Sequence, residues 1–350
     1  MKKLSSKDII DILPPDFSKH TVKDISVLSN SVFGESHFSS MKKMFWGNFG
    51  VTLWMAKPNN HVVFYRSARE YDDYAKKCGE YFNKSLYGTK KIAQKLIRYT
   101  NWFEDFFKKN PLLHDLVKNS KKFFETYRNF FAVHQAVYWG GDYLHRLKKS
   151  NRKIKKIISI LAATYQYNEL VVPHAEKYFK KLHTNHLLYD EVNDRVKNNI
   201  KYKQKLRSLL FVGRKRYILI QKDAKAIEQK INNWTKQGLQ NINIIKGLGV
   251  SRGKFKGIVK VITTDSGRLL KCDQRDILVM PMTRPHYNEF IKKVGAIVTD
   301  EGGLLCHASM LAREFNIPCI VGTKIATKVL HGGQLIEVDA NKGIVKILEK

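Results

Sequence analysis

The chain is poor in the residues that mark secreted, metal-binding and membrane-spanning proteins. Its 350 residues include only four cysteines and eight prolines. The cysteines form neither a CxxC pair nor any spacing typical of a metal site, which favours a reduced, cytoplasmic protein. The longest apolar run, residues 157–165, is too short and too closely flanked by lysines to span a bilayer. Residues 1–17 lack the continuous apolar core of a signal peptide, so we expect none.

Acidic residues are also scarce, with 31 against 63 basic residues and a formal net charge of +32. Such a charge is common in proteins that bind nucleic acid or another polyanion. However, 48 of the basic residues are Lys and only 15 are Arg, although Arg is better suited to bidentate recognition of phosphates. The Lys excess accompanies many Asn, Ile, Tyr and Phe, which indicates compositional drift. Residues 1–246 carry a net +26 and residues 247–350 a net +6, so any role of the charge, for an acidic partner or an anionic substrate, belongs to the first part.

The pattern of apolar residues divides the chain into three regions. Residues 1–67 form a small mixed region: residues 1–40 are polar and expected to pack loosely, and residues 45–67 predict a β-hairpin around a KPNN turn. Residues 68–240 have apolar residues at three- and four-residue spacing and predict a helical domain. Its dense aromatic residues are expected to form mostly core, with a minority lining a ligand cleft. We therefore expect an α+β N-terminal region dominated by helices.

A stretch rich in Gly and Asn, residues 235–250, reads as a linker that leads into a third region, residues 246–350. The pattern there predicts a compact α/β domain. Its predicted helices cover residues 285–293 and 307–315. Its predicted strands cover residues 257–263, 276–280, 295–299, 318–322, 334–339 and 343–348.

One histidine stands where a predicted strand gives way to a predicted helix. The segment TDEGGLLCHASMLAREF places Gly302 and Gly303 in a tight turn and His307 in the first turn of the helix. A helix N-terminus offers backbone N–H groups and a positive dipole end, so it favours a neutral imidazole and can hold an anion. Because histidine can form covalent intermediates, these surroundings suit a phosphohistidine carrier. The plain alternative is a histidine that caps its helix or bonds a neighbour.

The motif extends well beyond the histidine. From Thr299 the sequence runs through GG, CHAS and ARE, and then through IPCIVGT, AT and VDANKGIV. This pattern closely resembles the phosphohistidine domain, also called the swivelling or mobile domain, of the phosphoenolpyruvate (PEP)-utilising enzymes. That family includes PEP synthase, pyruvate phosphate dikinase and rifampin phosphotransferase. The resemblance covers about residues 246–350, implies an α/β swivelling domain, and makes His307 the phosphoryl carrier.

Residues close to His307 are expected to support it. Thr299 and Asp300 are candidates to hydrogen-bond the second ring nitrogen, or simply to form the turn. Arg313 follows His307 by six residues, so it is expected to fix the domain or meet a phosphate elsewhere. Phosphate and turn support is thus assigned to Gly302, Gly303, Thr299, Asp300 and Arg313.

For several other residues we expect no catalytic or metal-binding role. Cys306 is interpreted as a small residue accepted beside the histidine, and Thr283 and Pro285 as residues that shape a loop. His183 and His186, in HTNH, have no further candidate ligands nearby in sequence, so we predict no metal site. No tightly bound cofactor is expected.

A carrier histidine needs a donor and an acceptor. In the resembled family the donor site is an ATP-grasp domain that binds Mg–ATP or a β/α barrel that binds PEP. The first 245 residues match neither, because they read as mostly helical and lack a Gly-rich lid. The resemblance therefore implies a phosphotransferase component incomplete on its own, like a PEP synthase split from its ATP-grasp domain. A separate ATP-grasp subunit would phosphorylate His307 with ATP and Mg²⁺, and the domain would turn about residues 235–250 to reach an unknown small-molecule acceptor.

Two alternatives stay open. One is a catalytically retired binding or regulatory protein of the same fold, against which the intact surroundings of His307 argue. The other is binding of nucleic acid or another polyanion through the basic helical region. The sequence holds no recognised nucleic-acid motif, so nucleic acid is the weaker expectation, and no membrane partner is expected.

Overall fold

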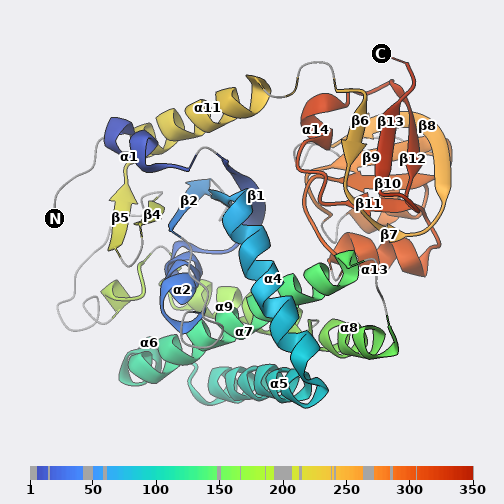
Figure 1. Cartoon of the computed structure of the whole chain (residues 1–350). Helices are drawn as coiled ribbons and strands as arrows, with labels where there is room; N and C mark the ends of the chain where they lie inside the picture. The colour runs from blue at the N-terminus through green and yellow to red at the C-terminus, as the bar shows by residue number, and fades with distance from the viewer. Residues whose placement is uncertain are drawn as a thin grey trace. The chain divides into compact units, whose positions relative to one another are not determined.

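Two units make up the computed structural model of the chain, Met1–Asn233 and Trp234–Lys350 (Figure 1). Their boundary lies next to the stretch 235–250 that reads as a linker in the sequence. The structure describes residues 6–14, 16–41, 50–57, 61–147, 151–165, 167–185, 187–192, 207–212, 215–237, 239, 242–262, 272–283, 287–304 and 306–349.

The first unit combines helices with a five-stranded antiparallel sheet of order β1-β3-β2-β4-β5. The strands are β1 (Phe17–Asp24), β2 (Val51–Lys57), β3 (His61–Ser67), β4 (Ser208–Val212) and β5 (Lys215–Leu219). The helices are α1 (Ser6–Ile12), α2 (Val27–Phe38), α4 (Ala68–Lys84), α5 (Leu86–Lys109), α6 (Leu113–Lys118), α7 (Ser120–Arg146), α8 (Arg152–Tyr165), α9 (Tyr167–Lys181) and α11 (Gln221–Gln237).

The strands of this sheet come from both sides of residue 67, where the sequence suggests a boundary between two regions. Strands β2 and β3 pair as a hairpin, and β4 then pairs with β2 although α4 to α9 lie between them in the chain. Residues 1–67 therefore do not form a region of their own, and residues 68–240 are not helical throughout. β4 and β5 have five residues each, too few for a periodic pattern to separate strand from helix. Residues 45–49 and 58–60 of the hairpin prediction lie outside the described residues.

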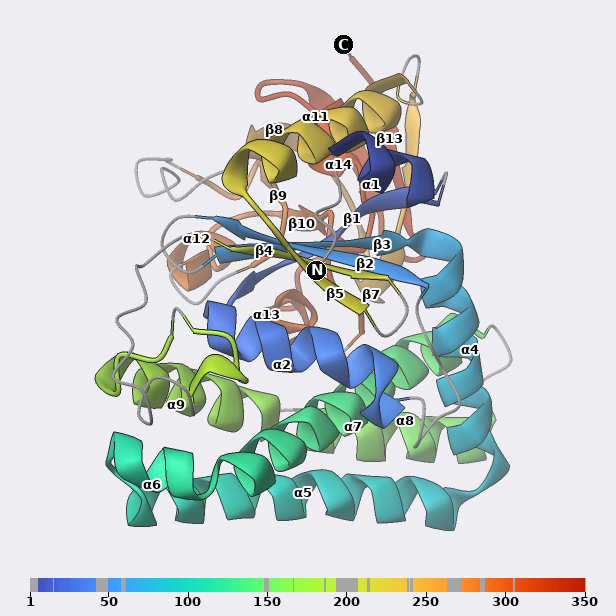
Figure 2. The ribbon, with the colours of Figure 1, turned by 90° about the vertical axis from the view of Figure 1, so that its left-hand side faces the viewer.

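Helix α2 is the most completely buried of the described helices in this unit, which corrects the expectation that residues 1–40 pack loosely. It lies against one face of the sheet, with α11 on the opposite face and α7 beyond α2 (Figure 2). Gly34 allows this close approach, because a Cβ there would lie 2.2 Å from the Phe211 ring of β4. The polar residues Ser29, Asn30 and His37 are each 0% exposed. The Ser29 hydroxyl lies 3.2 Å from the Tyr127 hydroxyl of α7, so a helix with a polar sequence is here almost completely buried between other elements.

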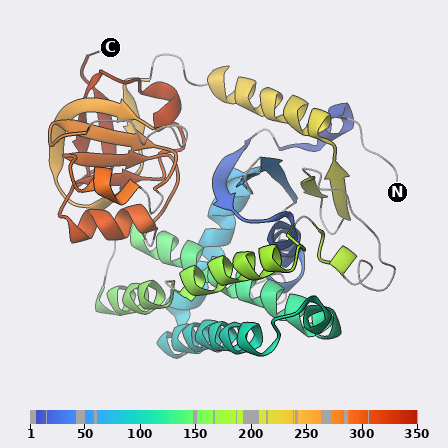
Figure 3. The ribbon, with the colours of Figure 1, turned by 180° about the vertical axis from the view of Figure 1, so that it is seen from behind.

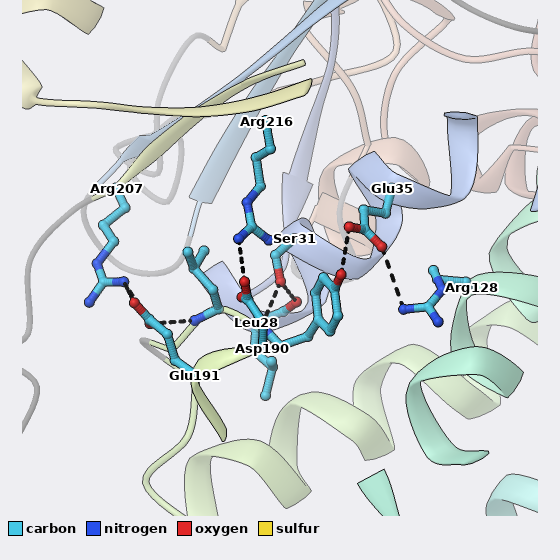
Figure 4. Close-up of polar contacts among 10 residues, drawn as sticks. Leu28, Ser31, Glu35, Arg128, Asp190, Glu191, Arg207 and Arg216 are labelled. Carbon is cyan, nitrogen blue, oxygen red and sulfur yellow. Dashed lines mark hydrogen bonds and ion pairs between the residues drawn. The ribbon is translucent and has the colours of Figure 1, made fainter. Parts of the chain in front are cut away.

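The segment 187–192 fastens α2 from a third side (Figure 4). The Tyr189 hydroxyl donates to Glu35 at 2.6 Å, and the Tyr189 backbone N–H donates to the Ser31 hydroxyl at 3.1 Å. Ion pairs anchor the same segment to the residues around β4 and β5: Arg216–Asp190 and Arg207–Glu191, each at 2.6 Å.

The second unit is built on an eight-stranded mixed sheet of order β6-β13-β12-β8-β9-β10-β11-β7. Its helices are α12 (Asn288–Ile291), α13 (His307–Glu314) and α14 (Ala326–Val329). Its strands are β6 (Ile244–Lys246), β7 (Leu248–Ser251), β8 (Lys254–Val261), β9 (Asp276–Met280), β10 (Ala296–Thr299), β11 (Cys319–Val321), β12 (Leu335–Asp339) and β13 (Ile344–Ile347).

The two edge strands of this sheet, β6 and β7, are joined by the single residue Gly247. The sheet therefore curls until its edges meet, and its orange and red strands wrap around a common interior in Figure 3. The Gly247 N–H donates to the carbonyl of Gly343 at 2.9 Å, which ties the joint to the end of the chain. The interior holds a buried cluster of aliphatic side chains that includes Val259, Val279 and Val298.

The six strands expected in this region correspond to β8 to β13, and the two expected helices to α12 and α13. β9 has the predicted bounds, β8 begins three residues earlier than predicted, and the other elements are shorter than predicted. β6 and all but the last residue of β7 fall within residues 235–250, the predicted linker. The glycines that suggest a linker there have a packing role instead. A Cβ on Gly249 would lie 1.8 Å from the carbonyl oxygen of Ala340, so only glycine allows the two backbones to approach so closely.

Candidate functional site

The candidate site lies at one edge of the second unit, where three neighbouring parallel strands end. β10 pairs in parallel with β9 on one side and with β11 on the other. Because parallel strands end at the same edge, the loops after Met280, Thr299 and Val321 come together. Two backbone hydrogen bonds join these loops: Thr323 N–H to the Thr299 carbonyl at 3.1 Å, and Lys324 N–H to the Asp300 carbonyl at 2.9 Å.

The loop between β10 and α13 takes its shape from glycine. Gly302 has φ +117°, and a Cβ there would lie 2.8 Å from the Cys306 sulfur. The carbonyl of Gly303 accepts from the Ser309 hydroxyl at 2.6 Å and from the Cys306 N–H at 3.1 Å. The two glycines predicted to form a tight turn thus fold the loop back onto the start of α13.

His307 is the first residue of α13, as the sequence indicates, and Cys306 is the N-cap residue. The imidazole is partly exposed. Its Nδ1 lies 3.2 Å from the Thr283 hydroxyl, which comes from the loop after β9 and is 7% exposed. This contact fixes the rotation of the ring. Thr283 is therefore a site residue, whereas the sequence suggested only a loop-shaping role; the signal that could have found it is its place just after a neighbouring parallel strand. Pro285 lies outside the described residues.

Thr299 and Asp300 make their described side-chain hydrogen bonds within the turn. The Thr299 hydroxyl donates to the Glu301 carbonyl at 2.5 Å. The Asp300 carboxylate accepts from the hydroxyls of Thr323, at 3.2 Å, and Thr327. The bonds of Asp300 link the β10 and β11 loops. The hydroxyl that contacts the imidazole is that of Thr283.

Arg313 braces the loop from the far side of α13. Its guanidinium donates to the Leu304 carbonyl at 3.2 Å. This bond links α13 to the loop that precedes it.

The cysteines near the site remain thiols. Cys306 lies 3.2 Å from the Ser309 hydroxyl. Because Ser309 donates its hydrogen to Gly303, the thiol is the donor in this contact. Cys319 in β11 is 0% exposed, and burial raises the pKa of its thiol well above the usual value. Neither arrangement indicates a nucleophilic cysteine.

The described part of the chain has neither a cluster of metal ligands nor a membrane-spanning helix. No group of three or more His, Cys, Asp or Glu side chains there is arranged to hold a metal ion. His183 adopts a left-handed turn conformation with φ 52°, and His186 lies outside the described residues. Among the described helices, none is both long and apolar enough to cross a bilayer.

The segment that holds the site resembles a domain of known proteins. Residues 272–343, which include Thr283 and His307, match the model of the PEP-utilising enzyme, mobile domain. A probable phosphoenolpyruvate synthase of Archaeoglobus fulgidus is 43% identical over 126 residues, which cover 36% of this chain and 16% of that protein. The phosphoenolpyruvate synthase of Pyrococcus furiosus is 48% identical over 102 residues, 29% of this chain and 12% of that protein.

An uncharacterised phosphotransferase of Bacillus subtilis, YvkC, is 34% identical over 126 residues, 36% of this chain and 15% of that protein. The chain therefore spans less than a fifth of each of these relatives. The segment that matches the mobile domain, residues 272–343, lies within the second unit.

Proposed function

We propose, starting from a second unit that contains a mobile domain of the PEP-utilising enzymes, that this chain carries a phosphoryl group on His307. The observation that supports this most directly is the placement of His307 at the first position of α13, with its Nδ1 3.2 Å from the Thr283 hydroxyl. Nδ1–H donating to Thr283 leaves the lone pair of Nε2 as the nucleophile. A phosphoryl group on Nε2 would then lie near the positive end of the α13 dipole.

In the proposed reaction, Nε2 attacks the phosphorus of a donor phosphate, and the bond from phosphorus to the donor oxygen breaks. An acceptor oxygen then attacks the same phosphorus, the N–P bond breaks, and the lone pair returns to Nε2. His307 ends as it began. Thr283 and the Gly302–Gly303 loop contribute by positioning, which together with charge stabilisation supplies most of the catalysis in phosphoryl transfer.

The donor and the acceptor are supplied outside the mobile domain. We propose that a separate ATP-grasp subunit phosphorylates His307 from ATP with Mg²⁺, with PEP as the alternative donor. The family match stops at residues 272–343, and the first unit has an antiparallel sheet that sits under α11 and over α2, which supports a role other than that of the donor domain. The stretch of chain between α11, which ends at Gln237, and β6, which begins at Ile244, would allow the second unit to turn between donor and acceptor.

Radiolabel transfer tests the proposal. The purified chain is incubated with ATP labelled at the β or γ phosphate, or with labelled PEP, each with and without host extract. We expect label that is acid-labile and base-stable, present in the wild type and absent in His307→Ala. The matched control is His331→Ala, which removes an exposed histidine of the same unit and should label normally.

Each outcome has a clear meaning. If labelling requires host extract, a separate donor subunit is supported. If ATP or PEP alone labels the chain, the chain itself phosphorylates His307, and the separate subunit is ruled out. No label under any condition, with the wild type folded, overturns phosphoryl transfer and leaves a retired binding domain.

A further inference from the structure

Two methionine residues flank the contact between His307 and Thr283. Met282 precedes Thr283 in the loop after β9 and is partly exposed. Met310 follows His307 by three residues on α13 and is 41% exposed. Among the described residues of the second unit, Met310 and Ile244 are the two exposed large apolar side chains. One of these two thus lies on the same helix as the proposed carrier histidine.

Helix geometry makes Met310 a direct neighbour of His307. Residues three apart on a helix lie on the same face, with Cβ atoms about 5–6 Å apart. The opposite face of α13 is turned inward, toward β7 and β11, and carries the buried residues Ala308, Ser309 and Ala312. Met310 therefore extends the outer face of the helix on which the imidazole lies.

A protein that phosphorylates His307 has to cover the residues around it. Before a bond forms between Nε2 and phosphorus, the two atoms approach to about 3–3.5 Å. A protein that holds the phosphate in a pocket brings the rim of that pocket to the same place. Met310, one helical turn from His307, and Met282, beside Thr283, lie where this rim would rest. A small donor that is free in solution makes no such contact.

The charges at this edge of the second unit fit a partner that presents phosphate. Asp300 and Glu301, the acidic residues of the loop before α13, are only 7% and 8% exposed. The Asp300 carboxylate accepts from the hydroxyls of Thr323 and Thr327. Lys324, in the loop after β11, is exposed. Among the described residues of these loops, the exposed charge is thus positive, and an approaching phosphate meets no exposed carboxylate.

Methionine suits a surface that meets more than one partner. Its side chain is flexible and polarisable, so it adapts to pockets of different shape and is common at surfaces that bind several proteins. A carrier histidine meets a donor and an acceptor in turn. The second unit has three methionines, and Met280 is 0% exposed in β9, whereas Met282 and Met310 are accessible beside the site.

We infer that Met282 and Met310 form a docking surface for the protein that phosphorylates His307, a partner whose phosphate pocket has an apolar rim. The inference rests on the proposed function and adds the surface through which that function works. In the docked complex the apolar rim covers both methionines and excludes water from Nε2. The docking surface promotes transfer by holding the partner and does not act on the imidazole itself.

Comparison of a protein donor with a small donor tests the inference. The full chain is phosphorylated either by ATP with host extract or by phosphoramidate, from which Nε2 takes the phosphoryl group as the P–N bond of the reagent breaks and ammonia leaves. Phosphohistidine is measured by mass spectrometry of the intact chain. The variant Met282→Gln/Met310→Gln keeps side chains of similar length without their apolar ends. We expect the rate with extract, divided by the rate with phosphoramidate, to fall about tenfold.

Three further variants make the result specific. Met310→Gln alone, at an exposed position, should lower the ratio about fivefold, so the test remains if the double variant folds poorly. Met310→Leu keeps an apolar side chain and should stay within about twofold of the wild type. Ile244→Gln is the matched control, because it removes the other exposed large apolar side chain of the same unit, and its ratio should equal that of the wild type.

Four results would overturn the inference. Equal ratios in the double variant and the wild type would remove the docking surface and leave phosphoryl transfer on His307 intact. An equal fall in Ile244→Gln would assign the effect to a general loss of apolar surface. Phosphorylation of the wild type by ATP or PEP without extract would mean that no separate protein docks. No phosphorylation with extract, in a chain that phosphoramidate does phosphorylate at His307, would overturn the proposed function and this inference with it.

Discussion

The two units place their polar side chains in opposite ways. In the second unit, Thr283, Asp300 and His307 lie in loops and at a helix start, where three parallel strands end. In the first unit, Ser29 and His37 lie inside the fold, on a helix covered from several sides. At the strand ends the partly exposed His307 contacts the buried Thr283, whereas on α2 the buried Ser29 contacts the Tyr127 hydroxyl of α7. Substitutions in the second unit should therefore change activity more than stability, and those around α2 should do the reverse.

The largest effect is expected where α2 meets the sheet. Gly34→Ala places a Cβ 2.2 Å from the Phe211 ring, so the ring or the helix has to move. Overpacking of this kind costs about 1–3 kcal/mol. Chemical denaturation should show an earlier transition for the first unit, while labelling of His307 stays normal.

The matched control for this variant is Gly88→Ala in α5, where a Cβ meets nothing closer than 3.4 Å. It should be neutral or stabilising by up to about 1 kcal/mol, because alanine favours helix. Equal stability of the two variants would show that the space around Gly34 can accept a methyl group, and that α2 is not tightly packed against the sheet.

A smaller effect, and one on activity, is expected at Thr283. Thr283→Val removes the hydroxyl beside His307 Nδ1 and keeps the shape of the side chain. Loss of one hydrogen bond, about 1.4 kcal/mol, corresponds to roughly a tenfold slower labelling of His307. Thr283→Ser should label at close to the wild-type rate, and the unfolding midpoint of the second unit should hardly change. A large loss of stability with normal labelling would mean that Thr283 supports the fold of the second unit and not the reactivity of His307.

A pH-dependent effect is expected at the start of α2. Glu176 accepts from the Ser26 backbone N–H at 3.0 Å and from its hydroxyl at 3.1 Å. Burial raises the pKa of Glu176, although these hydrogen bonds lower it in part. The folded state therefore takes up the proton more readily than the unfolded state does. The contribution of Glu176 to stability is full below its unfolded pKa and is lost as the pH rises through the folded pKa.

Glu176→Gln cannot titrate, so it isolates this contribution. The unfolding free energy of the wild type relative to the variant should fall as the pH is raised from about 4 to about 7. Denaturant titrations at several pH values measure it. A difference independent of pH would mean that the pKa of Glu176 is the same in the folded and unfolded chain.

The smallest effect is expected for a polar pair on the surface of the same unit. Lys109 and Asp105 form an i,i+4 ion pair in α5 at 2.9 Å, with side chains 72% and 58% exposed. Asp105→Asn should cost no more than about 0.3–0.5 kcal/mol, and the cost should disappear at high salt. A larger loss of stability that does not depend on salt would contradict the comparison, because an exposed polar pair would then matter as much to stability as the buried residues of α2.

The sequence predicts the second unit well because its signals are local. Each of β8 to β13 is a short β-branched run, and His307 follows a glycine turn at a helix start. Thr283 was missed as a partner because its role depends on which strands are neighbours. β6 and β7 were missed because the glycines that let Gly249 approach Ala340 also resemble a flexible linker.

The first unit is harder to predict because its signals are not local. α2 has no apolar stripe, since it buries Ser29, Asn30, Ser36 and His37 along with its apolar residues. Its environment depends on β4, which is separated from it by the helices α4 to α9. The sheet of this unit forms only when these distant segments meet.

The pairing of β6 with β13 has a consequence for how the second unit can be reused. Ile245 on the first strand is the register partner of Val345 on the last, so the chain enters and leaves this unit side by side. A domain with adjacent ends can be inserted into a loop of another protein, or joined at either end, without disturbing its own fold. Adjacent ends would thus let the second unit be joined to different partners in evolution, which fits the match of residues 272–343 within it to the model of a single domain.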